Sequence, residues 1–191
     1  TFSIRDESFN AAAAKQYFLF ARIGQSRFSF CVLDNSRNKF ICLQSYSLDT
    51  AANSQLSDKI TAIANENEIL QVKNFGKVIV SLAHRKSTLI PASMYEEKHE
   101  GNYLGLNFPL EQNESSASDY IQLLDAYSIY TVSNSLQESL TSIFPSQQLY
   151  HSSSLLIESL LLQNKNQAEK KLFVFMQEGY FEVALLEGKK L

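Results

Sequence analysis

The sequence predicts an α/β fold whose mixed sheet opens with an antiparallel three-strand meander and is duplicated in a second lobe that is only partly present. Residues 19–33 and 172–186 align without a gap, and each copy has an apolar run, a short polar break and a second apolar run. Three strand-like segments joined by short polar turns favour antiparallel pairing. An amphipathic helix pattern and a short buried strand follow, which is a layer order typical of α/β folds.

The first half of the chain is expected to hold the meander, a helix and the buried strand. Residues 1–15 are interpreted as a leader, either a loose terminal segment or an edge strand. Aromatic and β-branched residues predict the three strands of the meander, at 17–23, 27–33 and 39–46. Apolar residues at helical spacing predict a helix over 51–70 with Asp49 or Thr50 as its cap. The run KVIVSL predicts a buried strand at 77–82.

The second half is less regular. Residues before Pro91 are expected to be extended, residues 93–107 to form one or two short helices, and residues 109–118 to form a polar loop. The remaining predicted elements are strands at 120–124, 126–132 and 148–151 and helices at 136–144 and 152–163. Ser133 or Asn134 is expected to cap the first of these helices, and the serines at 152–154 the second.

Composition argues against several classes of protein. The net charge is -3 and no basic stripe is visible, so we expect no nucleic-acid partner. No segment approaches the roughly 20 apolar residues of a membrane helix, so we expect no direct membrane insertion. The chain has two cysteines, Cys31 and Cys42, which we interpret as small buried hydrophobes on one face of two adjacent strands. Together these features predict a cytoplasmic protein.

Three stretches and the two hairpins carry a family resemblance. The stretches are KVIVSLAHRKSTLIPASMY (77–95), YLGLNFPLE (103–111) and FPSQQLYHSSSLLIESLL (144–161). The chain resembles the actin-like ATPase superfamily, which has a ribonuclease H-like fold and includes actin and the sugar kinases. It is more similar to the cell-division and pilus-assembly members, and most similar to an uncharacterised family of Bacteroidetes proteins, a domain of unknown function with an actin-like fold.

The resemblance implies a first actin-like lobe at 16–163 and the start of a second, truncated lobe at 168–191. A second meander like the first would need one more strand after Leu191. We therefore expect the chain to be an incomplete copy of a longer protein.

Functional members of the superfamily place an Asp and then a Gly in the first turn of each lobe. The Asp positions the metal or the attacking water, and the Gly lets the backbone approach the phosphates closely. In those columns this chain has Arg22-Ile23-Gly24 in the first lobe and Phe175-Met176-Gln177 in the second. The resemblance therefore marks a vestigial phosphate site with no catalytic residue and no metal ligand, at Arg22, Gly24, Gln25, Ser26, Gln177, Glu178 and Gly179. ATP and magnesium are not expected to bind.

Two interpretations stay open for several of these residues. Arg22 is either a cation that holds an anion where the metal would sit or a strand-end arginine. Gly24 is either a surviving phosphate-loop glycine or a turn residue. The run His84-Arg85-Lys86 is either a small anion site or a solvated loop.

The loss of both acids favours a non-catalytic protein, because phosphoryl transfer depends on charge placed at the phosphates. We expect a pseudo-enzyme that acts as a scaffold or adaptor through an unknown protein partner, a role that is compatible with a homo-oligomer. The alternative is an ATP-binding protein or slow ATPase with a non-standard phosphate site. A nuclease of related fold ranks last, because its first strand should carry a carboxylate where this chain has Arg22.

Overall fold

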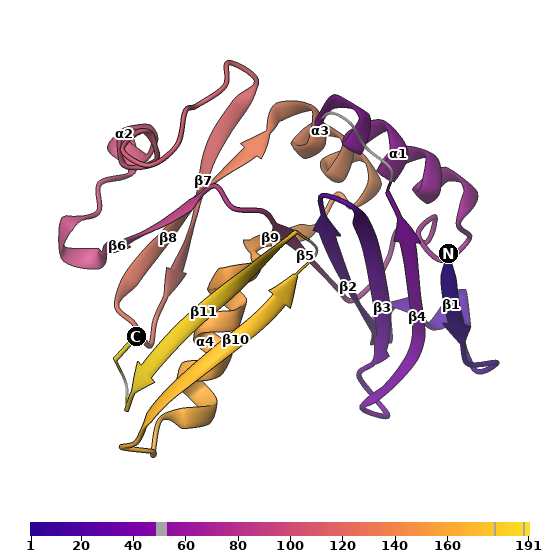
Figure 1. Ribbon diagram of the computed structural model, residues 1–191. Coiled ribbons are helices and arrows are strands. Elements are labelled where there is room, and N and C mark those ends of the chain that lie inside the picture. The colour runs from indigo at the N-terminus through magenta and orange to yellow at the C-terminus, as the bar shows by residue number, and fades with distance from the viewer. Residues whose placement is uncertain (49–52, 178, 189) are drawn as a thin grey trace. The chain divides into compact units, whose positions relative to one another are not determined.

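The computed structural model describes residues 1–48, 53–177, 179–188 and 190–191, and its elements are labelled in Figure 1. These residues form two compact units that alternate along the chain. Unit 1 consists of Thr1–His84, Glu111–Ser115 and Val132–Tyr150. Unit 2 consists of Arg85–Leu110, Ser116–Thr131 and His151–Leu191. The predicted lobe boundaries, 1–15, 16–163 and 168–191, stay predictions.

Unit 1 is built on a six-stranded mixed sheet in the order β1-β4-β3-β2-β5-β9. The strands are β1 (Phe2–Arg5), β2 (Tyr17–Gly24), β3 (Arg27–Asp34), β4 (Lys39–Ser47), β5 (Lys77–Ala83) and β9 (Gln147–His151). β2, β3 and β4 form the predicted antiparallel meander, and β5 lies parallel to β2. The leader includes a short edge strand, since β1 pairs with β4, and a 3-10 helix, η1 (Ala11–Gln16).

Two helices accompany this sheet, α1 (Asn53–Glu66) and α3 (Asn134–Ile143), and they lie beside each other in unit 1 (Figure 1). Alternate residues of β2 and β3 are buried on one face of the sheet, as expected for strands that cover a core. The N-cap residue of α3 is Ser133, as one of the two predicted choices had it. The predicted caps of α1, Asp49 and Thr50, lie outside the described residues.

Gly76 joins the start of β5 to the leader. Its backbone N–H donates to the carbonyl oxygens of Ala14 and Tyr17, at 3.2 and 3.0 Å. A Cβ atom at this position would lie only 2.3 Å from the carbonyl oxygen of Lys15. Backbone therefore passes so close to backbone here that only glycine fits.

Unit 2 contains a three-stranded sheet in the order β6-β8-β7 and a separate hairpin of β10 and β11. The strands are β6 (Ser87–Pro91), β7 (Glu114–Ile121), β8 (Ala126–Ser133), β10 (Lys170–Gln177) and β11 (Tyr180–Glu187). The helices are η2 (Ala92–Met94), η3 (Glu97–His99), α2 (Glu100–Gly105) and α4 (Ser152–Asn164). In Figure 1, α4 lies along the hairpin, and its buried leucines pack against Phe173 and Phe175.

Two predictions in this region were wrong. The predicted loop at 109–118 contains the first half of β7, and the predicted strand at 120–124 is the end of β7 followed by a turn. β7 begins ESSASD, and most of these residues stay at least partly exposed. A strand that is solvated along most of its length needs no apolar alternation, so its sequence looks like a loop.

The two hairpins share the same register. Ile23 pairs with Phe28 in the first, and their counterparts Met176 and Phe181 pair in the second. The gapless alignment of residues 19–33 with 172–186 therefore extends to the hydrogen-bonded ladder. The hairpins are equivalent pieces of a duplicated structure.

The cysteines do not share a face of the sheet, which corrects the prediction. The ladder pairs Cys31 with Leu43 and Cys42 with Val32, so the two side chains point to opposite faces. Both thiols are free.

In the part of the chain that the structure describes, no helix has both the length and the apolar character needed to cross a membrane.

Candidate functional site

The candidate site residues of unit 1 lie at the turn between β2 and β3. Arg22 is half-buried near the end of β2, and its ladder partners are Ser29 on β3 and Ser81 on β5. Side chains that are paired across a ladder lie on the same face of the sheet. The position at which the resemblance places a carboxylate is therefore a cation flanked by two serines.

Gly24 is the last residue of β2 and pairs with Ala83 of β5. A Cβ atom there would lie 3.5 Å from the carbonyl oxygen of Arg27, an ordinary contact. The fold of this turn therefore does not require glycine. Gln25 is exposed, and the carbonyl oxygen of the half-buried Ser26 accepts a hydrogen bond from the Leu48 backbone N–H at 2.7 Å.

The candidate residues of unit 2 lie at the turn between β10 and β11. Gln177 pairs with Tyr180 and closes the ladder, and Gly179 has a φ of 80°. A side chain at that φ is strained, so glycine is required for this tight turn. Glu178, the remaining predicted residue, lies outside the described residues.

Arg85 holds this second turn, a role that the sequence did not reveal. Its Nη2 donates to the carbonyl oxygen of Gly179, and its guanidinium carbon lies 5.2 Å from the centre of the Tyr180 ring. Both contacts use the planar charged group of arginine. The two residues are 94 positions apart, so no local pattern links them. Arg85 is exposed in the loop between β5 and β6, as the solvated-loop interpretation expected, and its guanidinium contacts the second turn.

A buried polar cluster in unit 2 involves His151, the residue directly before α4. The Asp119 carboxylate accepts hydrogen bonds from the His151 backbone N–H at 2.7 Å and from the Tyr130 hydroxyl at 3.2 Å. Burial raises the pKa of Asp119, and these hydrogen bonds oppose the rise. The Nδ1 atom of His151 accepts from the Ser153 N–H at 3.3 Å, so His151 caps α4 in place of the predicted serines.

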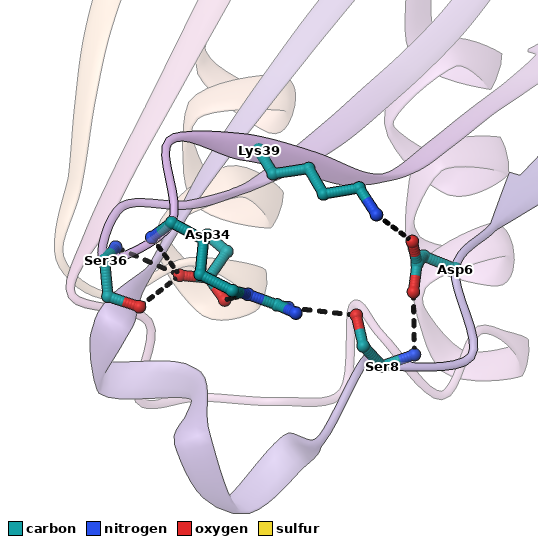
Figure 2. A network of polar contacts seen from close by, with 6 residues as sticks. Asp6, Ser8, Asp34, Ser36 and Lys39 are labelled. Carbon is teal, nitrogen blue, oxygen red and sulfur yellow. Dashed lines mark hydrogen bonds and ion pairs between the residues drawn. The ribbon is translucent and has the colours of Figure 1, made fainter.

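A second polar network connects the leader to the turn between β3 and β4 (Figure 2). The buried Asp34 carboxylate accepts from the Ser36 hydroxyl at 2.6 Å and from the Arg37 Nε at 2.7 Å. Arg37 also donates to the Ser8 hydroxyl at 2.9 Å, and Lys39 pairs with Asp6 at 2.6 Å. These contacts fasten two segments of unit 1 to each other.

Hydrogen bonds from Ser36 and Arg37 to the Asp34 carboxylate outweigh its burial and lower the pKa of Asp34 to about 2. The carboxylate is therefore charged at neutral pH and already committed to its neighbours in the turn. We interpret this network as structural.

The charged residues at 96–100 form local pairs. Glu96 lies 2.9 Å from Lys98 and 3.6 Å from the Nδ1 of His99, and Glu100 accepts from the Tyr95 hydroxyl at 2.6 Å. Among residues 1–48, 53–177, 179–188 and 190–191, no group of three or more His, Cys, Asp or Glu side chains is arranged to hold a metal ion.

Comparison with known proteins identifies the fold. A family model described as "Protein of unknown function (DUF3822)" matches residues 6–191. No curated protein matches the sequence. A solved Bacteroides thetaiotaomicron protein, described as having an actin-like ATPase fold and unknown function, superimposes with a TM-score of 0.87 at 20% identity. The match covers 95% of this chain and 70% of that one.

A second solved structure, the PilM-PilN type IV pilus biogenesis complex, matches with a TM-score of 0.53 at 13% identity. That match covers 90% of this chain and 58% of the other. Identities this low show the fold alone. The predicted α/β, actin-like ATPase fold and the similarity to a pilus-assembly protein are confirmed.

Proposed function

Because the chain belongs to the DUF3822 family of proteins of unknown function, we propose from its geometry that it is a non-catalytic actin-like scaffold or adaptor. In this proposal the protein works in the cytoplasm, binds another protein and requires neither ATP nor magnesium. A homo-oligomer is compatible with such a role.

The observation that carries the proposal is Arg22. An enzyme that transfers a phosphoryl group needs a carboxylate to position the cation or the attacking water. Arg22 lies at the corresponding position near the end of β2, where its ladder partners are serines. The guanidinium of arginine carries a positive charge, so it repels the divalent cation that the position would otherwise hold.

The second turn supports the same conclusion. Phe175 stands at the position of the second acid, and its side chain is packed in the apolar cluster around α4. Arg85 already binds the Gly179 carbonyl and lies over the Tyr180 ring. This turn is therefore held by contacts within the protein, and these contacts stabilise the turn without a bound ligand.

The similarity to the PilM-PilN complex supports a protein partner, because that relative of the fold is seen in a complex with another protein. The fold alone does not define function.

The alternative, an ATP-binding protein or slow ATPase, is favoured by two glycines. Gly24 stands at the family's glycine position in the first turn, whereas Gln177 stands at that position in the second. Gly179 lies two residues further on, and its positive φ gives the second turn a tight backbone bend. Such bends allow close approach to phosphate.

Calorimetric titration of the natural protein with magnesium-ATP distinguishes the two functions. We expect no binding tighter than about 1 mM for the natural sequence. Arg22→Asp places a carboxylate at the position where the family has its first Asp. This variant should bind magnesium-ATP at least about tenfold more tightly, which is about 1.4 kcal/mol. Arg27→Asp makes the same charge change at an exposed position of the same turn and should improve it by less than threefold.

Micromolar binding of magnesium-ATP by the natural sequence would overturn the proposal and favour the alternative. Equal effects of Arg22→Asp and Arg27→Asp would show that net charge, rather than the position of Arg22, governs binding.

A further inference from the structure

The hairpin of β10 and β11 has one covered face and one open face. On the covered face Phe173, Phe175, Ala184 and Leu186 pack in the cluster around α4. The open face consists of three apolar residues from each strand, which are between 52% and 79% exposed: Leu172, Val174, Met176, Phe181, Val183 and Leu185. Soluble proteins rarely leave a contiguous apolar face of this kind in water, so it marks a surface that is meant to be covered.

The internal repeat shows what happens to the same face in unit 1. The six residues at the equivalent ladder positions of β2 and β3 are at most 3% exposed: Leu19, Ala21, Ile23, Phe28, Phe30 and Val32. Both hairpins have the same register, so the comparison is between the same face of the same motif. One copy is buried, and the other is open.

The cover of the unit 1 face comes from the segment that follows the hairpin. β4 extends the sheet beside β3, and α1 buries Ile60 and Ala64 in the same unit. Asn67, just after α1, donates through Nδ2 to Gln44 at 2.6 Å and to the Tyr46 hydroxyl at 2.7 Å. Gln44 and Tyr46 pair with the two buried phenylalanines of β3, so the end of α1 is fastened to this face. In unit 1 the segment after the hairpin thus contributes a neighbouring strand and an amphipathic helix to the burial of this face.

We propose that the open face binds a further segment of the same polypeptide, which adds a strand beside β11 and lays an amphipathic helix over the six apolar residues. The repeat places the counterpart of Lys39, the first residue of β4, directly after Leu191. The Bacteroides thetaiotaomicron structure is also longer, since this chain covers 70% of it. The proposal does not depend on whether a nucleotide binds.

Cysteine labelling tests the proposal. Val183→Cys places a thiol on the open face, and Gln122→Cys places a control thiol in the exposed turn between β7 and β8. Each variant is made in the natural protein, from its complete gene, and in residues 1–191. The rate of reaction with a maleimide is read peptide by peptide by mass spectrometry, so that Cys31 and Cys42 are followed separately.

We expect Val183→Cys to react at least tenfold more slowly in the natural protein than in residues 1–191, and Gln122→Cys to react within twofold in both. Leu185→Cys, on the same face of β11, repeats the measurement if the Val183 variant does not fold.

Three results would overturn the proposal. The first is an equal rate of Val183→Cys labelling in the two proteins, or an intact mass showing that the natural protein ends at Leu191. The second is protection in residues 1–191 that grows with protein concentration, which would assign the face to a second copy. The third is protection of the natural protein only in the presence of another protein, which would assign it to a partner.

Discussion

At the scale of single residues, the proposed choice between catalysis and binding rests on Arg22 and Phe175. The family resemblance identified both positions, because each follows from its place in a repeated hairpin. The contacts of Arg85 and Asp119 could not be predicted from the sequence, because they join residues that are 94 and 32 positions apart. The roles of residues in a local motif can be predicted from their type and spacing, whereas contacts between residues far apart in the sequence cannot.

The structural role of Asp34 predicts a pH dependence. Its folded pKa, about 2, is below its ordinary value of 3.8, so the carboxylate stabilises the fold above pH 4, and this contribution is lost as the pH falls through 2. Asp34→Asn should therefore lower the free energy of unfolding at pH 7, and the difference from the natural sequence should shrink steadily between pH 4 and pH 2. Urea unfolding at several pH values measures both effects.

Asp58→Asn is the matched control, since Asp58 is exposed on α1. It should change the free energy of unfolding little at any of these pH values. A deficit of Asp34→Asn that is equally large at pH 7 and pH 2 would show that the charge of Asp34 has no part in the stability of the turn.

At the scale of elements, periodicity predicted most of the strands and helices. The strands of the meander and the buried strand β5 are where aromatic and β-branched runs placed them. The first part of β7 was missed because its polar sequence has no alternation. The faces of Cys31 and Cys42 were wrong because the ladder shifts between Val32 and Leu33. A register shift of one residue moves each side chain to the other face of the sheet relative to the partner strand, and no sequence pattern predicts such a shift.

Arg85 predicts a local effect on the hairpin of β10 and β11. Arg85→Ala removes the hydrogen bond to Gly179 and the stacking on Tyr180. Amide hydrogen exchange at Tyr180 and its neighbours in β11 should become several-fold faster, because the turn then opens more readily. Exchange in the β2–β3 hairpin should stay unchanged.

Arg85→Lys separates the charge from the planar group. Lysine keeps the charge but lacks the fork that both donates and stacks, so we expect most of the acceleration to persist. Exchange rates equal to those of the natural sequence in both variants would mean that Arg85 does not stabilise the turn.

At the scale of the whole molecule, the fold was more predictable than the function. The order of elements and the repeated hairpin led to the actin-like fold, which the solved relatives confirm. The proposed function depends on whether the two turns hold a charged ligand, and a few side chains on a shared fold determine that. Arg22 and Phe175, which stand where the resemblance places carboxylates, are the physical basis on which we propose a role in binding protein rather than nucleotide.

The most direct test is a crystal structure of the natural protein grown with ATP and Mn²⁺, whose anomalous scattering locates the cation. We expect no anomalous peak and no triphosphate density at the β2–β3 turn beside Arg22 or at the β10–β11 turn beside Gly179. A manganese peak with phosphates held by the backbone of these turns would contradict the proposed loss of nucleotide binding.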